Sequence, residues 1–428
     1  MKVCVAGVGY VGLVVGTCLA YLGHDVICFD KDEKKIRDLE QGQVPIYEPG
    51  LAGLIEQTDN LQVTTNGAWA ISQSTVMVIA VGTPPQPDGS ADLSAIYAVA
   101  ELIARYASQP FYVIIKSTVP IGTAYRVRAL IEGITDIPFD VISNPEFLRE
   151  GDAVGDFMRP ARIVVGYQKE TSRDVIEMLY EPFLKNTPIY YMDNQSAEIT
   201  KYASNTMLAI KTSFINEIAL LCESADADVE SVAAAVGADP RIVRPGLYAG
   251  VGYGGSCFPK DVACLLKTSK DLGVDMSVAK AAHARNVKQK VRLVEKLAEH
   301  IAISSSRHIA VWGLAFKPGT DDVRRASSLD TVRRLLELGA TVSAFDPRAM
   351  ATAQQKLGDT ITYAPDALSA LDGADALLLV TEWDEFRDVN WFEAASRMRG
   401  RLILDGRNLW NPATVKAAGF EYRGIGRS

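Results

Sequence analysis

The sequence has 428 residues, of which 48% are hydrophobic and 22% are charged, with a formal net charge of −8. This length allows two or three domains, and the composition is typical of a soluble globular protein. The negative charge argues against nucleic acid as the main partner, because phosphate backbones select basic surfaces. The six cysteines include no Cys-x-x-Cys pair and no zinc-binding spacing, so we expect reduced thiols in a cytoplasmic protein without a metal site.

The first 30 residues have the pattern of a buried strand, a glycine-rich loop, an apolar helix and a second strand. Residues 3–22 carry no charge, almost the length of a membrane span, but glycines interrupt the run and we predict no membrane segment. Residues 7–12 read Gly-Val-Gly-Tyr-Val-Gly, the spacing of a dinucleotide-binding loop between a strand and a helix. The loop residues that we expect to contact the cofactor are Gly7, Gly9, Tyr10, Val11 and Gly12.

Asp30 ends the second predicted strand. A carboxylate at this position accepts a hydrogen bond from the ribose 2′-hydroxyl and repels a 2′-phosphate, which favours NAD over NADP. Lys31 and Lys35 leave NADP open, because a nearby cation could tolerate the phosphate. The alternative interpretation is that Asp30 is an ordinary surface acid after a strand.

Three more strands are predicted in this part of the chain, at residues 75–81, 112–116 and 141–142, and each leads into a polar loop. In an open α/β sheet, the loops at the carboxyl ends of the strands form the ligand site. We therefore expect four side chains from these loops to converge near the nicotinamide end of the cofactor: Thr83, Thr118, Glu146 and Glu150.

From about residue 196 the hydrophobic pattern becomes helical. One long helix is predicted over residues 196–223, and a second helical stretch over residues 261–302. Lys201 and Asn205 are four residues apart, so they share one face of the first helix. Taken alone, such a pair would more often be an ordinary solvated pair than part of a site.

The run Gly-Tyr-Gly-Gly-Ser-Cys-Phe-Pro-Lys-Asp at residues 252–261 leads into the second helical stretch. Pro259 suits the first position of a helix, which places Cys257 just ahead of the helix N-terminus. Free N–H groups and the helix dipole favour a thiolate there, and the glycines allow the backbone to approach a substrate closely. Cys257 is thus a candidate nucleophile, with Lys260 and Asp261 nearby in the chain; the alternative is a buried structural cysteine.

Residues 308–346 repeat the N-terminal pattern, with a strand, a glycine, a helix and a second strand that ends in aspartate. The loop at residues 313–324 lacks the three-glycine spacing and offers Lys317 and Arg324 instead. Such a loop suits a different phosphate-bearing ligand, held by side-chain charge.

The predicted fold class is α/β, with two Rossmann-like doubly wound domains joined by a central, mainly helical domain. The expected boundaries are residues 1–195 for the NAD-binding domain, 196–302 for the central domain and 303–428 for the second nucleotide-binding domain.

These parts together suit the oxidation of a primary alcohol to a carboxylate. Hydride transfer from an alcohol to NAD needs no cysteine. Oxidation of the resulting aldehyde is explained by one, because a thiolate adds to the aldehyde and the thiohemiacetal is then oxidised to a thioester. None of the four histidines lies in a motif, so we do not expect a histidine base.

Sequence runs that match a known family extend over essentially the whole chain: residues 7–12, 45–51, 116–123, 144–151, 201–205 and 252–261. They resemble the UDP-glucose/GDP-mannose dehydrogenase family. Residues 255–261, 381–384 and 405–408 look most like the members that oxidise UDP-glucose. The resemblance implies the NAD-dependent, two-step oxidation of UDP-glucose to UDP-glucuronate by a homodimer that joins through its central helices.

The resemblance also implies roles for individual residues. The catalytic roles are nucleophile for Cys257, oxyanion stabilisation for Lys201 and Asn205, positioning of water and protons for Asp261 and Thr118, and general base in thioester hydrolysis for Glu150. The substrate site would include Glu146, Phe147, Leu148, Lys201, Asn205, Tyr248, Gly254, Phe316, Lys317 and Arg407, with Arg241 reaching in from the neighbouring subunit. The residues that would touch NAD, besides the glycine-rich loop, are Asp30, Lys35, Thr83, Thr118, Glu150, Lys260 and Arg324.

Three alternatives remain open. A GDP-mannose 6-dehydrogenase has the same fold and chemistry. A single-oxidation hydroxyacid dehydrogenase also uses a helical lysine with an asparagine four residues on, but it needs neither Cys257 nor the second nucleotide-binding half. An NAD-sensing regulatory protein would not need the combination of Cys257, Lys201, Asn205 and Glu150. One departure from the family pattern is Arg325, where the family usually has glutamate beside the diphosphates.

Overall fold

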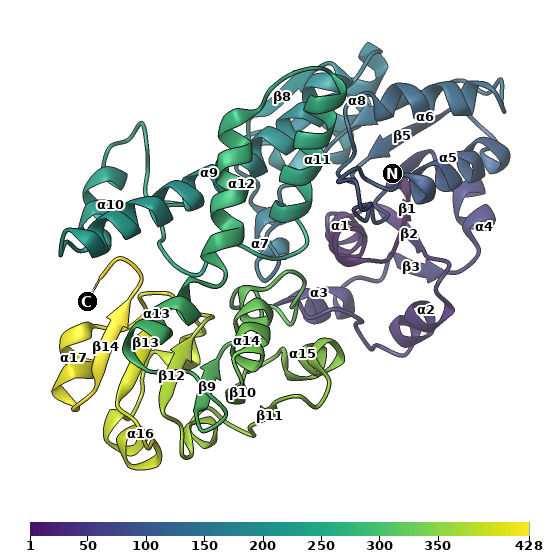
Figure 1. The fold of residues 1–428 in the computed structure, drawn as a ribbon. Helices are drawn as coiled ribbons and strands as arrows, with labels where there is room; N and C mark the ends of the chain where they lie inside the picture. The colour runs from purple at the N-terminus through teal and green to yellow at the C-terminus, as the bar shows by residue number, and fades with distance from the viewer. Residues whose placement is uncertain (428) are drawn as a thin grey trace. The chain divides into compact units, whose positions relative to one another are not determined.

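The computed structural model describes residues 1–427, which form two compact units (Figure 1). The first unit comprises Met1–Ser204 with Ala263–Val274, and the second comprises Asn205–Val262 with the chain from Asp275 onward. Two helices contribute residues to both units, α9 (Asn194–Ser224) and α11 (Phe258–Asp271).

The first unit is built on an eight-stranded sheet with the order β3-β2-β1-β4-β5-β6-β7-β8. Neighbouring strands are parallel except for β6 and β7, which are antiparallel. The sequence order reverses between β1 and β4, and ligands bind at such a reversal in open α/β sheets. The strands are β1 (Lys2–Ala6), β2 (Asp25–Phe29), β3 (Leu61–Thr64), β4 (Val76–Ile79), β5 (Phe111–Ile115), β6 (Phe139–Ser143), β7 (Ile163–Gly166) and β8 (Ile189–Met192).

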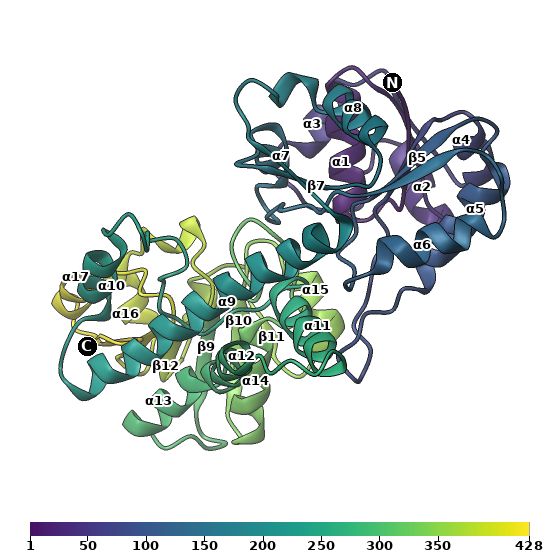
Figure 2. The same ribbon diagram turned by 90° about the horizontal axis from the view of Figure 1, so that it is seen from above.

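Helices cover both faces of this sheet, which explains why a strand such as β4 is apolar and buried throughout. Helices α1, α3, α7 and α8 pack on one face, and α4, α5 and α6 pack on the other (Figure 2). Ile36 of α2 belongs to the same core as α1. Their bounds are α1 (Tyr10–Tyr21), α2 (Glu33–Glu40), α3 (Leu51–Glu56), α4 (Gly67–Ser72), α5 (Ser94–Tyr106), α6 (Thr123–Glu132), α7 (Ala153–Met158) and α8 (Glu170–Leu179), with the 3-10 helix η1 (Glu181–Phe183).

The second unit contains a six-stranded parallel sheet with the order β11-β10-β9-β12-β13-β14. This order repeats that of the first six strands of the other sheet, with the reversal between β9 and β12, so the predicted internal repeat is confirmed. The strands are β9 (His308–Trp312), β10 (Thr341–Phe345), β11 (Thr362–Tyr363), β12 (Ala376–Leu379), β13 (Leu402–Asp405) and β14 (Glu421–Gly424). The helices are α10 (Val229–Gly237), α12 (Ser277–Gln289), α13 (Arg292–His300), α14 (Ser327–Glu337), α15 (Met350–Leu357), α16 (Trp391–Arg397) and α17 (Pro412–Ala417), with the 3-10 helices η2 (Ser369–Leu371) and η3 (Asp384–Phe386).

The predicted fold class is confirmed, whereas the three domain boundaries stay a prediction. The helical stretch predicted at residues 261–302 consists of three helices. Gly273, with a positive φ of 73°, terminates the first of them, α11. Helix α11 begins at Phe258, one residue before Pro259, so Cys257 lies directly before it as predicted. Across residues 1–427, every helix is too short or too polar to span a bilayer.

Candidate active site

The glycine-rich loop joins β1 to α1 in the first unit. Gly7 has a φ of 98°, which side chains rarely adopt, and a Cβ on Gly12 would lie 1.8 Å from the Gly7 carbonyl oxygen. A Cβ on Gly9 would meet no atom within 4 Å, and no side chain in the described part of the chain caps α1. The first N–H groups of α1 are therefore available to an anion such as a pyrophosphate.

Asp30 follows β2 and lies beside this loop. Its carboxylate accepts hydrogen bonds from the backbone N–H of Val8 at 2.8 Å and of Asp32 at 3.0 Å. The ammonium group of Lys35 is 3.8 Å from the same carboxylate. The predicted ribose acceptor and its neighbouring cation are thus held next to the glycine-rich loop.

The loops that follow β4 and β5 are joined by hydrogen bonds. The Thr83 hydroxyl donates to the Thr118 carbonyl oxygen at 2.8 Å, and the Ser117 hydroxyl donates to the Val81 carbonyl oxygen at 2.7 Å. Two of the four residues expected to converge are therefore in contact.

Lys201 on α9 forms a buried ion pair with Glu146. Its ammonium group donates to the Glu146 carbonyl oxygen at 2.6 Å and to Oε1 at 2.8 Å, and the Leu148 N–H donates to Oε2 at 2.6 Å. The same ammonium group is 5.3 Å from the centre of the Phe147 ring. Burial acts to raise the pKa of Glu146, but Lys201 and these hydrogen bonds outweigh it and hold the pKa below its usual value.

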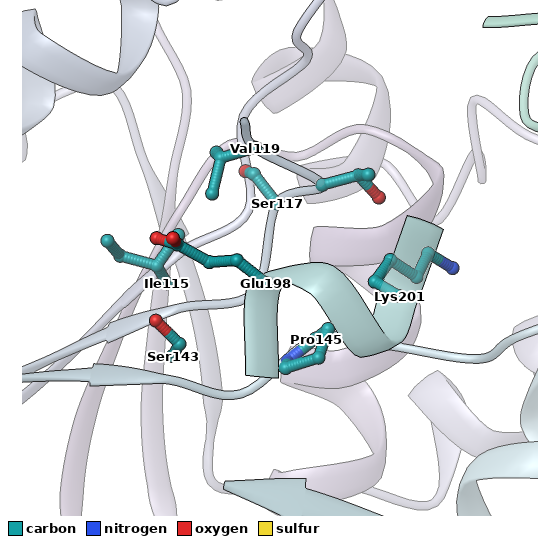
Figure 3. Close-up of a pocket in the computed structure, with 8 residues that line it drawn as sticks. Ile115, Ser117, Val119, Ser143, Pro145, Glu198 and Lys201 are labelled. Carbon is teal, nitrogen blue, oxygen red and sulfur yellow. The ribbon is translucent and has the colours of Figure 1, made fainter. Parts of the chain in front are cut away.

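A small pocket in the first unit connects Lys201 with the Thr118 loop, and Figure 3 shows its lining. Glu198, one turn before Lys201, accepts hydrogen bonds from the N–H groups of Gly122 at 2.5 Å and Ala124 at 2.8 Å. Burial raises the pKa of Glu198 to about 7, although these donors favour the ionised form. The lining residues are Ile115, Ser117, Thr118, Val119, Ser143, Pro145, Glu198 and Lys201.

Lys116, like Glu198, is a buried charged residue that the sequence did not identify as part of the site. Its ammonium group donates to Asn144 Oδ1 at 3.1 Å and to the Tyr180 hydroxyl at 3.2 Å, and burial lowers its pKa to about 8. The sequence signal for Lys116 was its position beside Ser117 in a run that matches the family. The signal for Glu198 was its position one helical turn before Lys201.

In the second unit, Cys257 is half-buried and directly precedes α11. Its carbonyl oxygen accepts the Asp261 N–H at 2.8 Å, which closes the first turn of the helix. Gly255 has a φ of 82°, and a Cβ there would lie 2.8 Å from the Phe316 ring. Glycine therefore allows the cysteine loop to pack against the second nucleotide-binding loop.

The buried carboxylate of Asp261 contacts two of the predicted site residues. The Asn205 side-chain amide donates to Oδ2 at 2.6 Å, and the Lys260 ammonium group is 3.2 Å from Oδ1. Asn205, Lys260, Asp261 and Cys257 thus form one cluster around the start of α11.

The loop after β9 extends this cluster. The Gly255 N–H donates to the Arg324 carbonyl oxygen at 2.9 Å, and a Cβ on Gly254 would lie 2.5 Å from the Arg325 carbonyl oxygen. The guanidinium group of Arg407 donates to the Phe316 carbonyl oxygen at 3.3 Å. Lys317 lies over the Phe316 ring, with its ammonium group 5.6 Å from the ring centre.

Three predicted side chains lie at the surface of the second unit. Arg241 pairs with Asp239 at 2.5 Å, and the Tyr248 ring packs under Arg244. The Arg324 side chain pairs with Asp322 at 2.7 Å, although its backbone contacts Gly255. Roles for these three side chains stay predictions.

Family models and known proteins match the chain over most of its length. Models of the UDP-glucose/GDP-mannose dehydrogenase family match the NAD binding domain at residues 1–184, the central domain at 195–288 and the UDP binding domain at 310–412. Similar curated proteins include a UDP-glucose 6-dehydrogenase of Pseudomonas aeruginosa, 44% identical over 442 residues, covering 100% of this chain and 98% of its own. Another is the UDP-glucose 6-dehydrogenase TuaD of Bacillus subtilis, 43% identical over 431 residues, covering 100% of this chain and 93% of its own.

Among solved structures, a UDP-glucose dehydrogenase from the archaeon Pyrobaculum islandicum superposes with a TM-score of 0.93 at 37% identity, covering 100% of this chain and 98% of its own. The fold, the glycine-rich loop and the matching NAD binding domain define an NAD-dependent oxidoreductase, which confirms NAD as the predicted cofactor. The chain belongs to the UDP-glucose/GDP-mannose dehydrogenase family.

Proposed function

We propose that this protein oxidises UDP-glucose to UDP-glucuronate in two NAD-dependent steps, through a covalent intermediate on Cys257. The observation that carries the proposal is the cluster around the start of α11, where the carbonyl oxygen of the half-buried Cys257 accepts the Asp261 N–H and the Asp261 carboxylate contacts Asn205 and Lys260. The two curated relatives, both named as UDP-glucose 6-dehydrogenases, support the choice of substrate.

The residues of the first unit suit NAD. The open face of Gly9 and the uncapped start of α1 would hold the pyrophosphate, and Asp30 would accept from the ribose. Thr83 and Thr118, which are joined by a hydrogen bond, would contact the nicotinamide end. When bound, NAD accepts one hydride in each oxidation.

The first oxidation removes a proton and a hydride from the C6 alcohol and leaves an aldehyde. The Cys257 thiolate then adds to the aldehyde carbon, and the oxyanion takes up a proton to give a thiohemiacetal. Lys201 and Asn205 stabilise this oxyanion by donating hydrogen bonds. Loss of a second hydride and a proton gives a thioester, and water cleaves its C–S bond to release the carboxylate and the thiolate, with Asp261 and Thr118 positioning water and relaying protons.

Two carboxylates are candidates for the base that activates this water. Glu150 is the base in our proposal. Glu146 is the second candidate, because it is in contact with Lys201, the ammonium group that stabilises the oxyanion. Glu150→Gln and Glu146→Gln separate them, since only loss of the base should allow the thioester to accumulate on Cys257.

The protein acts as a cytoplasmic homodimer in this proposal. Within residues 1–427 all six cysteines are thiols, in keeping with a reducing compartment. Exposed apolar side chains along α9, which include Met207, Phe214 and Leu221, are in keeping with a partner that covers them. Arg241, with its side chain 87% exposed, would reach the substrate of the partner subunit.

Mixing an Arg241→Ala chain with a Cys257→Ala chain tests the shared site. Each variant alone should be almost inactive. A heterodimer contains one site with both native residues, so activity should return as the chains exchange. Verified heterodimers without activity would contradict the role of Arg241 across the interface.

The choice of substrate is tested by the initial rate of NADH formation with purified protein. UDP-glucose should be used with a kcat/KM at least roughly tenfold above that for GDP-mannose, a difference of about 1.4 kcal/mol. A preference for GDP-mannose would support the alternative dehydrogenase. A preference for a small hydroxy acid would support a single oxidation.

A further inference from the structure

Glu48 is a buried acid in the matching run at residues 45–51, and the proposed chemistry does not use it. Both of its carboxylate oxygens are occupied. Oε1 accepts the Ala153 N–H at 2.7 Å, and Oε2 accepts the Gly151 N–H at 2.7 Å and the hydroxyl of Tyr10. A buried carboxylate is stable only when its oxygens are hydrogen-bonded in this way.

These three partners belong to segments that lie far apart in the sequence. Tyr10 is the first residue of α1 and part of the glycine-rich loop, whereas Gly151 directly follows Glu150 and Ala153 begins α7. Gly151 has a φ of 87°, and its N–H also lies 2.9 Å from the Tyr10 hydroxyl. The backbone next to Glu150 is therefore hydrogen-bonded to both Tyr10 and Glu48. Tyr10 belongs to the cofactor loop, and its hydroxyl donates to Glu48.

The hydrogen-bond direction is fixed by the chemistry of the pair. Burial and the neighbouring Glu48 carboxylate raise the pKa of Tyr10, so the phenol stays protonated and donates to the carboxylate. Asp32, by comparison, caps α2 through the N–H groups of Lys34 and Lys35 within its own turn. Glu48 differs because its contacts connect the cofactor loop at Tyr10 with the segment at Gly151 and Ala153, whereas Asp32 caps only its own helix.

We propose that Glu48 is a positioning residue that fixes the loop carrying Glu150 against the glycine-rich cofactor loop. It acts through Tyr10 and Gly151 and does not touch the substrate. For the task performed by Glu150, this inference rests on the proposed function. Loss of the Glu48 contacts should therefore weaken NAD binding and slow thioester hydrolysis together.

Glu48→Gln is the decisive variant. Its amide retains one acceptor oxygen but turns an NH2 group toward a backbone N–H, so one of the two backbone contacts is lost. Losing a hydrogen bond to a charged group changes an equilibrium roughly 10- to 100-fold, and we expect the dissociation constant of NAD to rise by that factor. UDP-glucose should then give a burst of NADH, followed by a slow phase in which the Cys257 adduct is visible by intact-protein mass spectrometry.

Asp140→Asn is the matched control in the same unit. Asp140 is a buried carboxylate on β6 that accepts from the Lys169 N–H at 3.3 Å and from the side chains of Ser172 and Arg128. This variant should lower the melting temperature without changing NAD affinity or producing a burst. Should Glu48→Gln not fold, Glu48→Asp keeps the charge, but its shorter side chain cannot reach all three donors, and it should show the same two effects at smaller size.

Tyr10→Phe completes a double-mutant cycle. If Glu48 acts through Tyr10, the burst in the double variant should be less than the sum of the two single effects. A Glu48→Gln protein with a lower melting temperature, unchanged NAD affinity and no burst would overturn the proposal. Weaker NAD binding in Glu48→Gln would support the role of Glu48 at the cofactor loop. If Glu150→Gln at the same time formed no covalent adduct, Glu150 would be rejected as the base.

Discussion

Asp30 and Asp346 occupy equivalent positions after the second strand of each sheet, but Asp346 has more hydrogen-bond donors and is more deeply buried. Asp346 is buried, and its Oδ2 accepts from the Leu314 N–H at 2.7 Å, the Ala315 N–H at 2.9 Å and the Trp383 indole at 3.0 Å. The Asp30 side chain keeps 14% of its surface exposed. Both carboxylates therefore hold their own loop, but Asp346 has further donors in Ala315 and Trp383 and is buried, whereas the partly exposed Asp30 suits a ribose.

Asp30→Ala should shift cofactor preference toward NADP. The change removes both the ribose acceptor and the charge that repels a 2′-phosphate, so the ratio of kcat/KM for NADP to that for NAD should rise roughly tenfold or more. Asp32→Ala is the control, because it removes the cap of α2 two residues away and should cost only about 1 kcal/mol of stability. A wild type that already prefers NADP would contradict the role of Asp30.

Glu198 predicts a pH dependence of stability. Its pKa is raised from 4.5 to about 7 in the folded protein, mainly by burial, so the folded state binds more protons between these values. Its contribution to stability is therefore complete below pH 4.5 and is lost as the pH rises through about 7, by on the order of 3 kcal/mol. Urea midpoints of Glu198→Gln should fall less over this range than those of the wild type, and parallel curves would contradict the assignment.

The elements that carry the site were predictable where their signals are local. Periodicity over residues 196–223 predicted α9, observed at Asn194–Ser224, and the strand-loop-helix pattern predicted the glycine-rich loop and Asp30. Glu48 and Glu198 were missed because their partners lie 103 and 76 residues away, and only tertiary packing brings them together. Arg241 stays a prediction for the same reason, since its expected partner is a second subunit.

The contact between the cysteine loop and the loop after β9 is tested by Gly255→Ala. The new Cβ would meet the Phe316 ring at 2.8 Å and force a side chain into a positive φ, displacing Cys257 two residues on. A displacement of about 1 Å should lower kcat/KM roughly a hundredfold. Gly273→Ala is the control: it has a φ of 73° with no atom within 4 Å of the new Cβ, so it should cost about 1 kcal/mol of stability and no activity.

Equal loss of activity in Gly255→Ala and Gly273→Ala would contradict this interpretation. The effect would then come from backbone strain alone and not from the contact with Phe316.

At the scale of the whole molecule, the two sheets share the order of six strands but differ in their loops. The first has a glycine-rich loop that is open at Gly9, and the second packs its loop against the cysteine run through Gly254 and Gly255. This division explains how one repeated fold serves a dinucleotide in one half and a nucleotide sugar in the other. The proposed four-electron oxidation requires both.

The number of NADH molecules formed per UDP-glucose at completion tests the covalent mechanism most directly. A ratio of two is predicted, with UDP-glucuronate as product and little free aldehyde, because Cys257 holds the intermediate between the two oxidations. Cys257→Ala should lose overall turnover. A ratio of one with free aldehyde released, or full activity in Cys257→Ala, would contradict a double oxidation and leave an ordinary alcohol dehydrogenase.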